Sequence, residues 1–259
     1  TEMPEVSIGN VQNEEAKTGV TVLLFDKKTG AVVGVDISGG GPASRETPLT
    51  SPVTADNPIN AIVLSGGSAY GLAASDGVMR CLEEHGIGFE TGYAKVPLVC
   101  QSCIYDLGYG SATVRPDSEM GYAACEKALA GGNPSSGSVG AGTGATVGKI
   151  CGMERAMKSG LGMYAVQLGE LRMAAVVAVN ALGDIFDSST GRKIAGLRTE
   201  DGTAFSDSCE ELWKMGQREN LFTGNTTIGA VITNGKFNKA QMNKIASMTR
   251  NAYARCINP

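Results

Sequence analysis

The segment Gly224-Asn225-Thr226-Thr227-Ile228-Gly229-Ala230-Val231-Ile232 joins a flexible turn to an apolar run. The apolar residues predict a buried strand from Thr226 to Thr233, which ends at an Asn-Gly turn. A hydroxyl residue between a Gly-Asn turn and a strand is a place where a chain can cut itself, leaving Thr226 as a new N-terminus that carries both a nucleophile and a base. Two simpler interpretations stay open at this point: a strand preceded by a turn, and an Asn-x-Thr glycosylation acceptor at Asn225.

The composition is that of a globular protein with an excess of glycine. Apolar residues make up 42% and charged residues 19% of the 259 residues, which is enough to bury a substantial core. Glycine accounts for 36 of the 259 residues, well above its usual share of about 7%. These glycines do not recur at a short period along the chain. This excess predicts many tight turns and close backbone approaches. No repeat or charged linker divides the chain, so we expect one domain over 1–259.

Charge and hydropathy exclude several classes of partner. The formal net charge of −4 and the pI of about 5.2 leave no basic footprint for nucleic acid. No apolar run approaches the roughly 20 residues needed to cross a membrane, and Thr1-Glu2-Met3-Pro4-Glu5 does not resemble a signal peptide. We therefore expect a cytoplasmic protein that binds neither nucleic acid nor membrane.

The cysteines indicate free thiols in a reducing compartment. There are seven, an odd number, and they are scattered along the chain. Cys100 and Cys103 form a lone C-x-x-C, but no second pair or nearby histidine completes a set of zinc ligands. We expect structural roles for these cysteines and no metal site.

The single histidine restricts the catalytic chemistry that is available. His85 follows Leu82-Glu83-Glu84 and precedes Gly86, a pattern that predicts the last turn of a helix ended by a glycine C-cap. A Ser-His-Asp or Cys-His enzyme would have to use this residue. Hydrolysis without histidine needs another base, and a free α-amino group is one of few candidates.

The remaining elements predict an α/β domain with much antiparallel pairing. Val20–Phe25 and Ala31–Val35 suggest a hairpin, and Ser68 is expected to cap a helix that follows a buried strand. The strands and helices expected elsewhere are strand Ala61–Leu64, helix Ser118–Leu129, a hairpin of Met163–Leu168 with Leu171–Asn180, and a final helix from an Asn238 cap to Cys256.

A glycine-rich loop, Gly140–Lys149, invites comparison with nucleotide-binding loops. A P-loop needs glycine five positions before the Gly-Lys pair, where this chain has Thr143, and Ser or Thr after the lysine, where it has Ile150. No nucleotide or other cofactor is therefore expected. A closely packed turn that delivers Lys149 into a cleft fits better, with a solvated lysine as the alternative.

The segment Ser65-Gly66-Gly67-Ser68 follows a strand and precedes a helix. It lacks the G-x-S-x-G pattern of a nucleophile elbow, and no histidine lies later in the chain. Its backbone N–H groups are candidates for holding a substrate carbonyl or carboxylate. An ordinary helix cap is the alternative.

Several segments together resemble the DmpA/BapA-type self-cleaving aminopeptidases, a family that also contains a nylon-oligomer hydrolase. They occur in the family's order and cover nearly the whole chain. The matching segments are Ala61–Leu72, Ile104-Tyr105-Asp106, Val114-Arg115-Pro116-Asp117, Gly140–Ala145, Val179-Asn180 and Gly224-Asn225-Thr226-Thr227.

The resemblance implies a four-layer α/β/β/α sandwich that cuts before Thr226, giving pieces 1–225 and 226–259. The Thr226 hydroxyl would attack the Asn225 carbonyl, and the freed α-amino group, with a pKa of about 7.7–8.0, would then serve as the base. It further implies that Tyr105 and Asn180 help to bind the oxyanion and that Lys149 lies near the nucleophile. A small peptide or amide substrate and a homo-oligomer are also implied.

One feature departs from the family pattern. In the family the final helix is followed by an acidic Asp-Gly-Asp-type segment that orients the nucleophile, whereas this sequence stops at Pro259. Either the sequence is truncated or part of the machinery is lacking. Two alternatives to an aminopeptidase therefore stay open: an acyl transferase like the ornithine acetyltransferases, and an uncleaved, non-catalytic relative.

Overall fold

Two β-sheets form the centre of the molecule. The computed structural model describes residues 3–132, 134–216 and 224–259. The first sheet has the strand order β1 (Val6–Asn13), β2 (Thr18–Phe25), β4 (Ala61–Ser65), β7 (Val99–Cys103) and β3 (Ser44–Arg45). The second sheet is antiparallel throughout and has the order β10 (Leu161–Leu168), β11 (Leu171–Asn180) and β14 (Thr226–Thr233).

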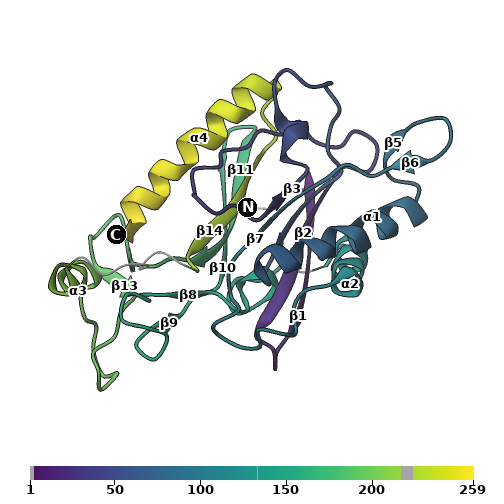
Figure 1. The fold of residues 1–259 in the computed structure, drawn as a ribbon. Coiled ribbons are helices and arrows are strands. Elements are labelled where there is room, and N and C mark those ends of the chain that lie inside the picture. The colour runs from purple at the N-terminus through teal and green to yellow at the C-terminus, as the bar shows by residue number, and fades with distance from the viewer. Residues whose placement is uncertain (1–2, 133, 217–223) are drawn as a thin grey trace.

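Helices cover the two outer faces of this pair of sheets. Helices α1 (Ala74–Glu84) and α2 (Ser118–Leu129) lie side by side against the first sheet, and α4 (Lys239–Cys256) runs along the far side of the second (Figure 1). The result is a mixed α+β fold with the α/β/β/α layering expected from the sequence. None of the helices in the described ranges has both the length and the apolar character needed to cross a membrane.

Apolar side chains hold the layers together in two clusters. One fills the space between the sheets, with Leu23 and Leu64 from the first sheet and Val176 and Ile232 from the second. The other lies between the first sheet and its helices, where Val63 packs with residues of α1 and α2. Strand β2 contributes to both clusters because all eight of its residues are buried.

Smaller elements lie outside the two main sheets. They include a three-stranded sheet and the short helix α3 (Ser208–Met215), none of which the sequence patterns predicted. The short strands are β5 (Phe89–Glu90), β6 (Lys95–Val96), β8 (Thr146–Val147), β9 (Met157–Lys158), β12 (Asp184–Phe186), β13 (Lys193–Ala195) and β15 (Ile257–Asn258), and the 3₁₀ helices span Thr47–Thr50, Ser68–Ala73 and Gly140–Gly142.

The predicted hairpin of Val20–Phe25 with Ala31–Val35 is wrong. Strand β2 pairs with the preceding β1 and with β4, and the second segment makes only an isolated bridge from Ala31 to Ile59. Residues around Gly34 instead lie against α4, where the Asn243 side chain accepts a hydrogen bond from the Val35 N–H at 3.2 Å. A fully buried strand needs partners on both edges, and β1 supplies the partner that the local pattern assigned to Ala31–Val35.

The ends of the helices can be compared with the capping residues predicted from the sequence. His85 is the C-cap of α1 and Gly86 follows with a φ of 68°, as predicted. Asn238 caps α4 through a capping box with Gln241. Ser68 as a helix cap is wrong: it lies within the 3₁₀ turn that precedes α1, where Gly67 holds the N-cap position of the turn and Ala73 that of α1.

Candidate active site

Strand pairing places Thr226 beside Asn180. The register of β11 and β14 sets Asn180 directly opposite Thr226 and Val179 opposite Thr227. Opposed residues of an antiparallel pair have Cα atoms about 4.5–5.5 Å apart. The last residue of one strand and the first residue of the other are thus neighbours at the same end of the second sheet.

The turn before Thr226 depends on glycine. Gly224 has a φ of 90°, and a Cβ atom there would lie 2.9 Å from the ring of Tyr105. Both the positive φ and the contact with the ring exclude a side chain. The flexible Gly-Asn approach predicted from the sequence is therefore a tight turn against Tyr105.

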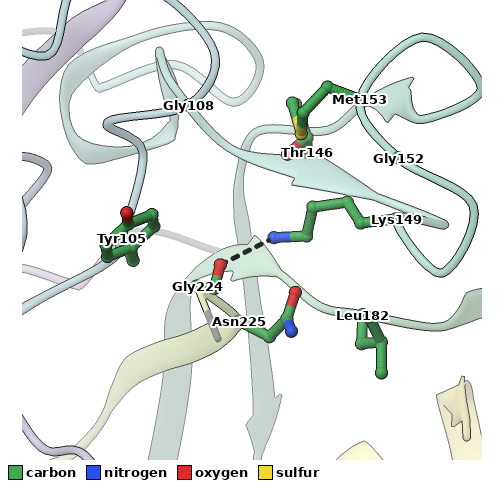
Figure 2. A pocket seen from close by; sticks show the side chains of 9 residues that line it. All are labelled: Tyr105, Gly108, Thr146, Lys149, Gly152, Met153, Leu182, Gly224 and Asn225. Carbon is green, nitrogen blue, oxygen red and sulfur yellow. Dashed lines mark hydrogen bonds between the residues drawn. The ribbon is translucent and has the colours of Figure 1, made fainter. Parts of the chain in front are cut away.

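Lys149 connects this turn to Asn180. Its ammonium group donates to the Gly224 carbonyl at 3.2 Å, to the Asn180 carbonyl at 3.0 Å and to the Asn180 side-chain oxygen at 2.9 Å. Figure 2 shows the lysine reaching across the pocket to the Gly224 carbonyl, with Tyr105 on the far side. Burial lowers the pKa of Lys149 to about 7. The glycine-rich loop does deliver this lysine into a cleft, as predicted.

Asn180 is fully buried and holds three segments together. Its side-chain oxygen accepts from the Thr146 backbone N–H at 3.0 Å as well as from Lys149, and its amide nitrogen donates to the Tyr105 carbonyl at 2.7 Å. An asparagine amide carries two N–H donors, and within residues 3–132, 134–216 and 224–259 the Asn180 amide nitrogen has this one acceptor. The arrangement fixes the amide relative to the start of β14.

A small pocket opens at this point. It has a volume of about 190 Å³ and adjoins a larger groove of about 1480 Å³ that runs along β14 and α4. Thr226 and Ser68 line the larger groove, and Tyr105, Gly224 and Asn225 line both. The full lining of the small pocket is Tyr105, Gly108, Thr146, Lys149, Gly152, Met153, Leu182, Gly224 and Asn225 (Figure 2).

The segment Ser65–Ser68 makes mainly internal contacts. Ser65 is fully buried and hydrogen-bonded to Gln101 at 2.9 Å, and Gly66 is packed too tightly for a side chain. The N–H groups of Gly67 and Ser68 donate to Asp106 at 2.7 Å and to the Ile104 carbonyl at 3.0 Å. Of the four residues that the sequence nominated for substrate binding, Ser68 is the one that lines the groove.

Two residues with structural roles at this site were not assigned from the sequence. Thr146 donates to Asn180 through its backbone, a contact that no side-chain pattern could reveal. Asp106 is buried and accepts from the Thr18 hydroxyl at 2.7 Å and from Gly67, and burial raises its pKa. Its place directly after Tyr105, in the family segment Ile104-Tyr105-Asp106, was the available signal.

Comparisons with known proteins agree on one family. The model of Peptidase family S58 matches residues 1–259. An uncharacterized aminopeptidase of Mycobacterium leprae is 37% identical over 249 residues, which cover 93% of this chain and 66% of that protein. A 6-aminohexanoate-oligomer endohydrolase of a Kocuria species is 33% identical over 265 residues, covering 100% of this chain and 70% of that protein. The chain thus spans about two thirds of the length of these relatives.

Solved structures share the fold. A β-aminopeptidase of a Burkholderia species superposes with a TM-score of 0.62 at 18% identity, over 99% of this chain and 67% of that one. The L-aminopeptidase D-Ala-esterase/amidase of Ochrobactrum anthropi, described as a variant of the Ntn hydrolase fold, gives 0.63 at 16% identity, over 98% and 67%. At such identities the likeness concerns the fold alone.

Proposed function

Because this chain belongs to Peptidase family S58, we propose that it is an N-terminal-nucleophile amide hydrolase that matures by cutting itself between Asn225 and Thr226. The observation that carries the proposal is the position of Thr226. It opens strand β14 opposite the buried Asn180, directly after a turn whose Gly224 carbonyl accepts from Lys149. A hydroxyl residue held at a strand end beside an amide donor and a lysine suits an intramolecular acyl transfer.

Maturation would proceed in two steps. The Thr226 hydroxyl oxygen attacks the Asn225 carbonyl carbon, the C–N bond breaks, and the acyl group moves from nitrogen to oxygen as an ester. Water then hydrolyses the ester, freeing the Asn225 carboxylate and the Thr226 hydroxyl and α-amine. In this proposal the second N–H of the Asn180 amide donates to the developing oxyanion, an interaction whose loss typically costs about 2.7–4 kcal/mol of barrier.

The mature enzyme would use the new N-terminus in place of a histidine. With an unperturbed pKa of about 7.7–8.0, the α-amine is partly neutral near neutral pH and takes the Thr226 proton during attack on the substrate. Lys149, with its pKa of about 7, is partly charged near neutral pH, and that charge favours the neutral form of the amine. A water molecule then releases the acyl group from Thr226, which returns the enzyme to its starting state.

The relatives' names suggest the class of substrate. They describe aminopeptidases and a hydrolase of 6-aminohexanoate oligomers, which are amides of an ω-amino acid. We propose a short peptide or amide with a free amino end, processed by a cytoplasmic homo-oligomer. The pocket of about 190 Å³ beside Asn225 is a suitable size for one small residue.

Intact-mass spectrometry of the denatured protein tests the proposal. The purified protein should separate into two pieces divided between Asn225 and Thr226, whereas Thr226→Ala should stay whole. Thr226→Ser keeps a hydroxyl and should still cut, and Asn180→Asp, which keeps the size but loses the amide donors, should cut more slowly by about 10²–10³-fold. An uncut wild-type protein that releases amino acids from p-nitroanilides would overturn the mechanism. Turnover of acetyl-ornithine with glutamate would instead favour the acyl transferase alternative.

A further inference from the structure

A cluster of metal-ligand side chains lies between α1 and α2, on the opposite side of the first sheet from the candidate active site. Cys81 and His85 are one helical turn apart on α1, and Glu126 faces them from α2. The three ligand atoms, one from each side chain, lie within 4.8 Å of one another. We propose that these three residues form a binding site for a zinc ion.

The distances in the cluster suit tetrahedral coordination. The Cys81 sulfur is 3.4 Å from a Glu126 carboxylate oxygen, and the His85 Nε2 atom is 3.6 Å from the same oxygen. Zinc binds sulfur at about 2.3 Å and imidazole nitrogen or carboxylate oxygen at about 2.0–2.2 Å. Ligands at tetrahedral angles and those bond lengths are separated by about 3.3–3.6 Å. Two of the three separations thus match those of a zinc site, and the third, between the Cys81 sulfur and the His85 ring, lies within 4.8 Å.

The His85 ring is held in the tautomer that a metal ligand requires. Its Nδ1 atom is 2.8 Å from the Cys81 carbonyl oxygen, which can only accept a hydrogen bond. The proton of the neutral ring is therefore on Nδ1, and the lone pair of Nε2 points toward Glu126. A backbone carbonyl that orients a ligating histidine in this way is a recurrent feature of protein metal sites.

The electrostatic surroundings favour a cation. His85 is the C-cap of α1, so the ion would lie at the end of the helix where the aligned peptide dipoles leave a partial negative charge. When zinc binds, the Cys81 thiol releases one proton to solvent, and the thiolate, the Glu126 carboxylate and the neutral His85 balance the two positive charges of the ion. The fourth position is left for water, since His85 and Glu126 are both about half exposed, with side-chain accessibilities of 44% and 46%.

The ligand types identify zinc rather than a hard cation. Magnesium and calcium prefer sites built from oxygen alone, whereas a thiolate, an imidazole and a carboxylate together suit zinc. Such an ion would join the last turn of α1 to α2. The single histidine of the chain, which the proposed reaction does not use, would then have a function beyond ending its helix.

Cobalt and zinc titrations of the chelator-treated, reduced protein test this inference. We expect one equivalent of Co²⁺ to bind with the near-ultraviolet charge-transfer band of a thiolate ligand, and one equivalent of Zn²⁺ to displace it and raise the Tm, whereas Mg²⁺ does neither. His85→Gln should weaken zinc binding at least tenfold, since even outer-shell partners are worth about 10–100-fold. That variant changes a half-exposed side chain, so it should fold even if Cys81→Ala does not.

Matched variants outside the cluster give the controls. Glu119→Gln removes an exposed carboxylate of the same helix as Glu126, where it pairs with Arg80, and Cys209→Ser removes a half-buried thiol elsewhere. Both should bind zinc like the wild type. Zinc binding without a thiolate band, equal affinity in His85→Gln, or no binding at one equivalent would each overturn the proposal.

Discussion

Lys149 is the residue through which the candidate site responds to pH. Its pKa is lowered to about 7 by burial, although it donates to three oxygens. In the unfolded chain the same ammonium keeps its proton to about pH 10. Between about pH 7 and pH 10 the unfolded state therefore binds more protons than the folded state. The contribution of Lys149 to the free energy of unfolding must rise with pH across this window.

Comparing Lys149→Met with the wild type tests this pH dependence. We measure the free energy of unfolding of both proteins in urea. The difference, wild type minus variant, should increase as the pH rises from 7 to 10. Lys158, whose pKa burial lowers to about 8, is present in both proteins and cancels. Lys244→Met, at an exposed position of α4, is the control and should show no such trend. A difference that is constant or falls with pH would contradict the assignment.

At the level of residues, the sequence could nominate Thr226, Asn180 and Tyr105 because family segments contain them, and Lys149 because the resemblance matches it to a lysine near the nucleophile. It could not show how they connect. Lys149 and Asn180 are 31 positions apart and Lys149 and Gly224 are 75 apart, and their hydrogen bonds use backbone carbonyls that have no sequence signal. The cluster of Cys81, His85 and Glu126 was missed for a related reason. Its third member comes from a different helix, so spacing along the chain does not reveal it.

At the level of elements, the contact between α1 and α2 depends on two glycines. A Cβ atom at Gly77 of α1 would clash with the Ser118 carbonyl, and one at Gly121 of α2 would clash with the Ala74 carbonyl. The helices can lie this close only because neither position has a side chain. Replacing Gly by Ala usually gains about 1 kcal/mol of helix propensity, but at these positions the clash between the new Cβ atom and the facing backbone outweighs that gain.

Gly77→Ala should lower the free energy of unfolding by about 1–3 kcal/mol, the usual cost of overpacking. Thermal and urea denaturation measure the change. Gly40→Ala provides the control, since a Cβ there meets nothing within 4 Å and no positive φ is needed, so it should leave stability unchanged. Equal stability of both variants would mean that the helices can separate without loss.

The elements predicted well are those with local signals at both ends. Helix α2 and strand β14 begin and end where the sequence indicated. The Asn-Gly turn after β14 was the predicted signal, and the structure adds the Asp117 side chain, which caps α2 by accepting from the Met120 N–H. The hairpin failed because the partner of β2 depends on which strands compete for its edges. The pairing depends on contacts across the whole sheet. The turn motif Lys28-Thr29-Gly30, between Val20–Phe25 and Ala31–Val35, favoured the wrong partner, and no equally strong turn motif joins β1 to β2.

At the level of the whole molecule, the site lies where the two sheets and the loop carrying Lys149 meet. Tyr105 follows the first sheet, Asn180 and Thr226 end and begin strands of the second, and Lys149 follows β8. Both sheets thus contribute to the site, and the core between them fixes their relative positions. A cut before Thr226 would leave these contacts in place, because no strand or helix in the described residues spans the bond between Asn225 and Thr226.

The two pieces of the matured protein should therefore stay together. All eight residues of β14 pair with β11, and Lys239, at the start of α4, is buried, donating to the Leu49 carbonyl at 2.9 Å and also to the Ala55 carbonyl. We expect 226–259 to co-elute with 1–225 on gel filtration in native buffer and to separate only in denaturant. The same assembly should form when the two pieces are produced as separate chains with an affinity tag on the larger one. The experiment with separate chains does not depend on self-cleavage. The uncut Thr226→Ala variant serves as the size standard, because the assembled pieces should elute at the same volume as this single chain. Loss of the small piece in native buffer would show that the covalent link, and not the β11–β14 ladder, holds the second sheet together.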